Sequence, residues 1–123
     1  LYYSNYYDWQ AKTIESYLYN IVPEVYMKNG REGEYFCYTC NVNHLQEAMP
    51  FENIEVKMYL ERVNEHSVTF FFEYFSLGNG ERRKLSYGSN TLIWCSRDSA
   101  EASPAVMSNP QELIVELKKH NVL

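Results

Sequence analysis

The stretch LYYSNYYDWQAKTIESYLYN, residues 1–20, decides the fold that the sequence predicts. Its periodicity is helical, and Asp8 and Lys12 stand one turn apart on a narrow polar stripe, where they can pair. Two further stripes are mostly aromatic or aliphatic: Tyr3, Tyr7, Gln10, Ile14, Leu18 and Ile21 on one, and Tyr2, Tyr6, Trp9, Thr13 and Tyr17 on the other. Because so little of this helix is polar, we expect the rest of the protein to enclose most of it. Pro23 should end it.

After residue 34 the pattern changes to the alternation that is typical of β-strands. Residues 54–60 place apolar side chains on one face, whereas residues 68–75 carry aromatic side chains on both faces. Asn79 and Gly80 suit a hairpin turn, and Gly88 in the next strand indicates a bulge or a close backbone approach. A last helix should begin with Asn109 as its cap and Pro110 in its first position. This order predicts an α+β fold in which an antiparallel sheet curls around the first helix.

The composition bounds the classes of protein to consider. The chain has 123 residues, of which 46% are hydrophobic, enough for the core of one domain. The net charge is −5 and basic residues gather only at 82–84, which argues against a nucleic-acid partner. No run of residues approaches the ~20 apolar residues that a membrane-spanning helix needs, which argues against a membrane partner.

Three cysteines, Cys37, Cys40 and Cys95, argue against a disulfide framework and fit a reducing compartment such as the cytoplasm. Cys37 and Cys40 have the C-x-x-C spacing, but we expect them on a strand, where residues three apart point to opposite faces. They should therefore not share a metal ion, and we expect small buried thiols instead. The sequence predicts neither a metal site nor a cofactor.

These elements and residues together resemble the hotdog-fold thioesterases, and more narrowly those of enediyne polyketide biosynthesis. The similarity continues through residues 23–25, 39–60 and 72–74, and it begins with the helix residues Tyr2, Tyr3, Asn5, Tyr6, Trp9 and Gln10. It closes with a strand that carries Gly88 and Cys95. The resemblance implies that residues 1–123 form a single hotdog domain, with a sheet wrapped around a central buried helix. It also implies a first strand, and a loop with a catalytic Asn or Asp, upstream of Leu1.

The resemblance also implies a chemistry and an assembly. The activity would be water-mediated hydrolysis of a polyunsaturated β-ketoacyl thioester on an acyl carrier protein, without a metal or cofactor. The assembly would be a homodimer or homotetramer with sites between subunits. Tyr6 matches the tyrosine that this family carries in its helix. The arginine that the family carries two turns further on is replaced by Ile14, so the arginine-assisted mechanism is not carried over.

Four residues are candidates for the chemistry. Free N–H groups at the start of the helix can stabilise the oxyanion of a thioester, and Tyr6 either donates a further hydrogen bond or packs in the core. Asn5 either does the same or holds the incoming loop. Glu47 is either a general base or a solvated carboxylate. His44 is either a second base or an exposed loop residue.

The substrate-binding candidates are Tyr3, Gln10, Ile14, Thr39, Arg82 and Arg83. The two arginines either meet the phosphate of a phosphopantetheine group or form a solvated hairpin edge. No nucleophile motif accompanies these residues. Two alternatives to the carrier-protein thioesterase stay open. One is a general acyl-CoA thioesterase, and the other is a non-catalytic acyl-binding hotdog module, which Ile14 favours.

Overall fold

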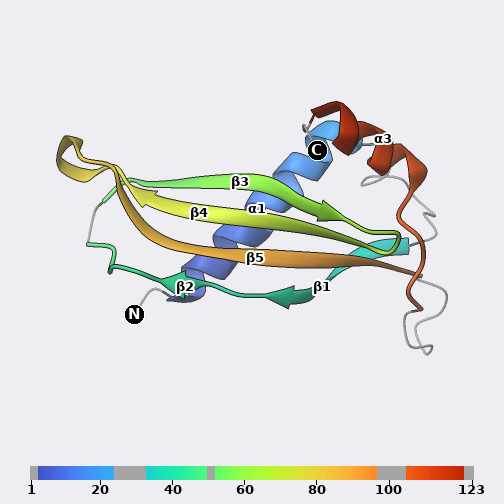
Figure 1. The fold of residues 1–123 in the computed structure, drawn as a ribbon, viewed down its shortest axis with the longest axis horizontal. Coiled ribbons are helices and arrows are strands. Elements are labelled where there is room, and N and C mark those ends of the chain that lie inside the picture. Colours follow the sequence, from blue (N-terminus) through green and yellow to red (C-terminus); the bar gives the residue numbers. More distant parts are fainter. Residues whose placement is uncertain (1–2, 24–32, 50–51, 97–104, 121–123) are drawn as a thin grey trace.

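The computed structural model describes residues 3–23, 33–49, 52–96 and 105–120. Figure 1 shows an antiparallel sheet with one long helix behind it and a second helix at one end. The elements are, in chain order, α1 (Tyr3–Ile21), β1 (Gly33–Cys40), β2 (Asn43–His44), β3 (Ile54–Val63), β4 (Ser67–Ser76), the 3-10 helix η1 (Gly78–Gly80), β5 (Arg83–Ser96) and α3 (Gln111–His120). The predicted α+β class is confirmed.

The strands form one sheet in the order β1-β5-β4-β3, and every pair of neighbours is antiparallel. β2 pairs with β5 beyond the end of β1, so that β1 and β2 together make one interrupted edge. α1 crosses one face of this sheet diagonally (Figure 1). This antiparallel sheet packed on a long helix is the arrangement that the sequence predicts.

One face of α1 is buried against the sheet. Its buried side chains recur every four residues: Tyr6, Gln10, Ile14, Leu18 and Val22. The opposite face is open, and Tyr7 and Tyr19 are 41% and 48% exposed. The expectation that most of the helix surface is enclosed was therefore wrong. A four-stranded layer reaches only the side of the helix that it touches, so Tyr7 lies outside it although Tyr6 lies within.

The core lies between α1, the inner face of the sheet and α3. Val68, Phe70, Phe72 and Tyr74 of β4 are each at most 1% exposed. Leu113 and Leu117 of α3 are fully buried and close the end of the core near the last turns of α1. Burial of a large apolar side chain contributes roughly 1.5–3 kcal/mol, so these contacts stabilise the packing of α1 on the sheet.

The side chain of Asn109 does not cap α3 as predicted. Its Oδ1 accepts a hydrogen bond from the Tyr35 hydroxyl at 2.9 Å, and its Nδ2 donates to the carbonyl of Asn64 at 2.8 Å. Asn109 therefore ties the start of α3 to β1 and to the turn between β3 and β4. These long-range partners use the polar atoms that a cap would need.

Gly88 marks a close backbone approach, as predicted. A Cβ atom at this position would lie 2.0 Å from the carbonyl oxygen of Asn41. Asn41 belongs to the segment between β1 and β2, and its N–H donates to Ser89 O at 2.9 Å. The lack of a side chain at Gly88 thus allows the interrupted edge to press against β5.

The edge strand β1 also contains a β-bulge. Cys37 pairs with Leu92 and Thr39 with Thr91, so Tyr38 is one residue in excess. Leu92 faces the core, and Asn90, the partner of Cys40, bonds to α1; Cys37 and Cys40 therefore share the face that α1 covers. The prediction that they point to opposite faces was wrong, and so was their predicted burial, because both are exposed; only Cys95 is buried.

Candidate functional site

Six side chains from four elements meet beside the first half of α1. We call this group the polar cluster: Tyr6 and Gln10 of α1, His44 of β2, Tyr74 of β4, and Ser86 and Asn90 of β5. All except His44 are at most 6% exposed. A buried polar group needs a hydrogen-bond partner, so the surrounding elements must supply a partner for each of these side chains.

Gln10 is fully buried and links α1 to β5 and to the segment between β1 and β2. Its Nε2 donates to the carbonyl oxygen of Asn41 at 3.1 Å, and its Oε1 accepts from Asn90 Nδ2 at 3.2 Å. Asn41 is held in turn by Ser89, to whose Oγ its side chain donates at 3.0 Å. The amide of Gln10 therefore fixes the position of the helix relative to the interrupted edge.

Tyr6 stands at the centre of an aromatic group. Its ring makes edge contacts with Tyr74, His44 and Trp9, at centroid distances of 4.8, 5.0 and 5.3 Å. The hydroxyl of Tyr74 donates to the backbone carbonyl of Tyr6 at 3.0 Å. These contacts hold the ring of Tyr6, and with it the second turn of α1, in one orientation.

Burial raises the pKa of Tyr74 above its ordinary value of 10.0, and a hydrogen bond with Gln10 offsets this in part. Charge on Tyr6, Tyr7 or Cys40 would raise it further. Tyr74 therefore stays a neutral phenol at physiological pH. Its role in the cluster is to donate a hydrogen bond rather than to exchange a proton.

His44 contacts Ser86 as well as Tyr6. Its Nδ1 lies 3.2 Å from Ser86 Oγ, and Ser86 is fully buried. An imidazole held in this way has a defined ring orientation and still reaches the surface, because His44 itself is exposed. The structure thus gives His44 a position beside Tyr6, and it is not an isolated loop residue.

Asn90 carries an unusual acceptor. Its Oδ1 is buried and has no hydrogen-bond partner among the described residues. Buried acceptors of this kind are normally satisfied, by a water molecule where no protein donor is near. The polar cluster therefore offers a site at which a water molecule can be held against β5.

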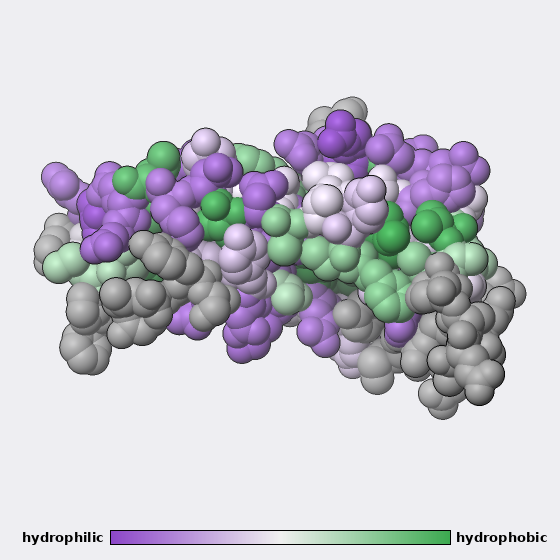
Figure 2. All heavy atoms as spheres, turned by 90° about the horizontal axis from the view of Figure 1, so that it is seen from below, coloured by the Kyte–Doolittle hydropathy of each residue, from purple (hydrophilic) through white to green (hydrophobic). Residues whose placement is uncertain are grey.

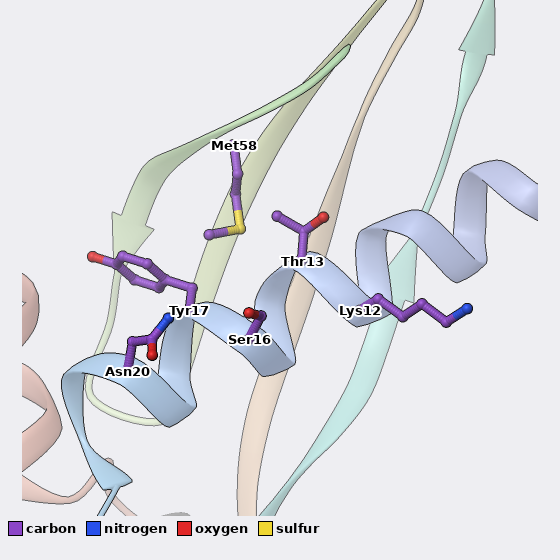
Figure 3. Close-up of a pocket in the computed structure, with 6 residues that line it drawn as sticks. All are labelled: Lys12, Thr13, Ser16, Tyr17, Asn20 and Met58. Atoms are coloured by element: carbon purple, nitrogen blue, oxygen red, sulfur yellow. The ribbon is translucent and has the colours of Figure 1, made fainter. Parts of the chain in front are cut away.

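A groove of about 420 Å³ runs along α1 on the side of β3. It is lined by Lys12, Thr13, Ser16, Tyr17, Asn20 and Met58. Figure 3 shows Met58 reaching from β3 toward the helix, where its sulfur lies between Thr13 and Tyr17. The groove starts one turn beyond Gln10 and leads away from the polar cluster along the helix.

The structure brings only some of the predicted site residues together. Tyr6 and Gln10 lie in the polar cluster. Ile14 is 5% exposed and belongs to the hydrophobic core. Tyr3 lies in the first turn of α1, and its side chain is outside the described part of the structure.

Three other predicted residues lie away from the cluster. Asn5 is on the exposed side of α1, and Glu47 is exposed in the segment that follows β2. Thr39 pairs with Thr91, whose hydroxyl contacts Thr69 at 2.9 Å on the face of the sheet opposite α1. Thr39 therefore lies on the outer face, whereas Gln10 faces the inner one.

Arg82 and Arg83 follow the hairpin, in which Gly80 has the positive φ of 76° that the sequence predicts. Arg82 forms an ion pair with Glu55 at 2.6 Å, and Arg83 with Glu52 at 2.7 Å. Arg83 also donates to Gln46. Both guanidinium groups thus form ion pairs with glutamates on and near β3. They would have to break these ion pairs in order to bind a phosphate.

Two classes of site find no support in the described ranges. No group of three or more His, Cys, Asp or Glu side chains is placed there to hold a metal ion. No helix within these ranges combines the length and the apolar character needed to cross a membrane.

Serine and asparagine on β5 were missed by the sequence analysis. Ser86 and Asn90 alternate with Gly88 on one face of the strand, and this period is visible in the sequence. Nothing in the sequence indicates their partners, since His44 is 42 residues and Gln10 is 80 residues away.

Several solved structures share this fold. The dynemicin thioesterase, described for its binding of a polyene, is 24% identical with a TM-score of 0.85, over 100% of this chain and 86% of its own. The 4-hydroxybenzoyl-CoA thioesterase of a Pseudomonas strain is 11% identical, with a TM-score of 0.79 over 94% and 85%. A gentisyl-coenzyme A thioesterase is 15% identical, with a TM-score of 0.72 over 96% and 86%.

Comparisons at the level of sequence find nothing: no family model and no curated protein matches the chain. The similarity is therefore one of fold, and it extends over the whole chain. The chain has the hotdog fold that the sequence predicts, shared with thioesterases.

Proposed function

We propose that this protein hydrolyses a thioester, and that its substrate is a polyketide or polyene acyl group bound to an acyl carrier protein. The observation that carries the proposal is the polar cluster beside the start of α1, in a fold that matches the dynemicin thioesterase over the full chain. The cluster combines hydrogen-bond donors, a histidine and a buried acceptor that a water molecule can satisfy, and the groove between α1 and β3 begins one turn further along the helix.

In the proposed reaction the thioester carbonyl lies near the first turn of α1. The N–H groups there have no acceptor within the helix, and the helix dipole favours negative charge at this end. Tyr6, held by its three aromatic neighbours, supplies a further donor. Together these groups stabilise the oxyanion that forms when water attacks the carbonyl carbon.

His44 is the proposed general base. With its Nδ1–H donating to Ser86 Oγ, its Nε2 takes a proton from the attacking water and returns it to the departing thiolate. The products are a carboxylic acid and the free thiol. Asn5 and Glu47, both exposed, stay predictions as a second donor and an alternative base.

The acyl chain is proposed to follow the groove between α1 and β3. Met58 and Tyr17 give it an apolar floor, whereas Lys12, Ser16 and Asn20 provide a polar rim that suits keto groups (Figure 3). We propose Tyr3, Gln10 and Ile14 as further contacts with the substrate. Thr39, which the sequence also predicts, lies on the outer face of the sheet and away from this groove. Arg82 and Arg83 would meet the phosphopantetheine phosphate of the carrier.

We also propose that the protein is a homodimer or homotetramer in the cytoplasm. Apolar side chains are exposed on β1 and beyond β2: Phe36, Tyr38, Leu45 and Met49, of which Tyr38 is 68% exposed. Figure 2, which views the molecule from this side, shows an apolar band across it. An unpaired edge with apolar side chains favours association with a second chain. Light scattering on the purified protein tests this, and a monomer at micromolar concentration would refute it.

Replacement of His44 tests the proposed activity. His44→Gln should lower kcat on an acyl carrier-protein thioester by about 10²–10⁴-fold, as expected for loss of a general base. His66→Gln is the matched control, because His66 is also exposed and its side chain lies beside Glu65, away from the polar cluster. Equal activity of both variants would refute the role of His44.

The substrate class needs a second measurement. The proposal predicts a higher kcat/KM for the carrier-protein thioester than for the same acyl group on coenzyme A. The reverse order would identify a general acyl-CoA thioesterase instead.

A non-catalytic acyl-binding module is the second candidate. Ile14 favours it, because an aliphatic side chain in the core replaces the arginine that the resemblance implies. This candidate predicts no turnover of any acyl thioester and stoichiometric retention of an acyl chain by the purified protein. Mass spectrometry of an organic extract of the protein distinguishes the two.

A further inference from the structure

The β-bulge in β1 creates a pair of neighbouring thiols. Without it, Cys37 and Cys40 would point to opposite faces of the sheet. The extra residue, Tyr38, shifts the register by one, so that Cys37 is opposite Leu92 and Cys40 is opposite Asn90. Leu92 and Asn90 are themselves two residues apart on the inner face of β5. The two cysteines are consequently adjacent positions on one face of the edge strand.

The two thiols interact and are accessible. Partial burial raises the pKa of Cys37, and both the charge of Cys40 and a hydrogen bond between the two side chains add to this shift. Both cysteines are exposed, whereas Cys95 is buried. Within the described ranges no cluster of metal-binding groups includes them. Two exposed thiols at neighbouring positions, with no third ligand among the described residues, are suited to thiol–disulfide exchange rather than to metal binding.

The two cysteines also lie next to Asn41, the residue whose backbone carbonyl binds the Gln10 amide. Asn41 follows Cys40 directly; its carbonyl accepts the Gln10 amide at 3.1 Å, and its N–H donates to Ser89 O at 2.9 Å. Gly88 presses against the same carbonyl. Any covalent link that ends at Cys40 therefore acts on the segment that joins α1 to the interrupted edge.

We propose that Cys37 and Cys40 form a reversible disulfide within one chain, closed by a small-molecule disulfide and opened by a thiol reductant, and that this bond restrains the Asn41 segment that holds Gln10. The juxtaposition across the bulge carries this inference. It does not depend on the proposed hydrolase activity.

The exchange balances with oxidised glutathione as the oxidant. The Cys40 thiolate attacks one sulfur of glutathione disulfide, which releases one glutathione thiolate and leaves a mixed disulfide on Cys40. The Cys37 thiolate then attacks the Cys40 sulfur and releases the second glutathione. The two cysteines lose two protons, which the two glutathione thiolates take up.

The test is thiol counting by mass spectrometry. The native protein is incubated with oxidised glutathione, quenched in acid, unfolded and alkylated. The wild-type chain should lose two alkylation sites and about 2 Da, with no glutathione adduct. Cys37→Ser should accumulate a glutathione adduct on Cys40, whereas Cys40→Ser should react more slowly. Cys95→Ser is the matched control and should close the bond as the wild type does.

A second readout follows the strand itself. Hydrogen exchange of the Asn41 amide should slow by at least about tenfold in the oxidised form and recover after addition of a thiol reductant. Three results would overturn the proposal: a mixed disulfide as the final wild-type product, a disulfide between two chains on a non-reducing gel, or three free thiols after oxidation. Unchanged exchange at Asn41 would overturn the restraint.

Discussion

The two halves of α1 pack on the same sheet with different chemistry. The first half buries Tyr6 and Gln10 among hydrogen-bonding groups from β4, β5 and the segment between β1 and β2. The second half buries Ile14, Leu18 and Val22 against apolar side chains of the sheet and of α3. The two halves of this one helix therefore have different roles. Apolar packing stabilises the second half, and the first half holds groups in defined orientations at the cost of burying polar atoms.

The largest effect on stability is expected in the apolar half. Leu18→Ala removes a side chain that is 2% exposed and leaves a cavity, which should lower the free energy of unfolding by about 3 kcal/mol. Urea denaturation followed by circular dichroism measures this. Activity per folded molecule should be preserved, because Leu18 lies two turns from Gln10.

A smaller loss is expected in the polar half. Gln10→Leu leaves Asn41 O and Asn90 Nδ2 without their partner, and should cost about 2 kcal/mol. The double variant Gln10→Leu, Asn90→Leu should recover part of this loss, since it removes one of the two orphaned groups. If the losses of the two single variants simply add, the proposed coupling between helix and β5 is wrong.

Alkaline pH tests the polar half through the ionisation of Tyr74, without a change in packing. Because burial raises the pKa of Tyr74, the folded state favours the neutral phenol. The resulting stability is fully present below the ordinary value of 10.0 and is lost as the pH rises above it. Tyr74→Phe should flatten the pH dependence of urea denaturation above about pH 10 relative to the wild type. A slope equal to that of the wild type would contradict this assignment.

The smallest effect is expected on the outward face, which belongs to neither half. Asp8 and Lys12 form the predicted i,i+4 pair at 2.9 Å, but both are more than half exposed. Asp8→Ala should change the free energy of unfolding by no more than about 0.5 kcal/mol, and added salt should remove even that difference. A loss similar to that of Gln10→Leu would show that this face is covered in solution.

Sequence patterns predicted what depends on near neighbours. The helical period of residues 3–20, the Asp8–Lys12 pair and the end of the helix before Pro23 are local properties, and all are confirmed. Gly88 also carried its own signal, because a glycine within a strand indicates close approach. Nothing local distinguishes Tyr6 from Tyr7, since only the position of the sheet decides which of them is buried.

What could not be predicted depends on pairing across long distances. The bulge at Tyr38 exists only because of the register with β5, and it reversed the expected placement of Cys37 and Cys40. The contact of His44 with Ser86 arises in the same way, because β2 and β5 are paired in the sheet although they are far apart in the sequence. Asn109 was expected to act within its own helix, and its partners lie on β1 and in the turn after β3.

The break between β1 and β2 has a consequence for how such a protein can change over evolutionary time. Gly88 and Asn41 lie in close backbone contact, and the strand segments before and after Asn41 pair with β5 separately. Insertions or substitutions after His44 would therefore change the orientation of its imidazole, while the pairing of Tyr35 with Trp94 stays intact. The orientation of the His44 imidazole can thus change by drift on one side of Asn41, with the stability of the other side unaffected.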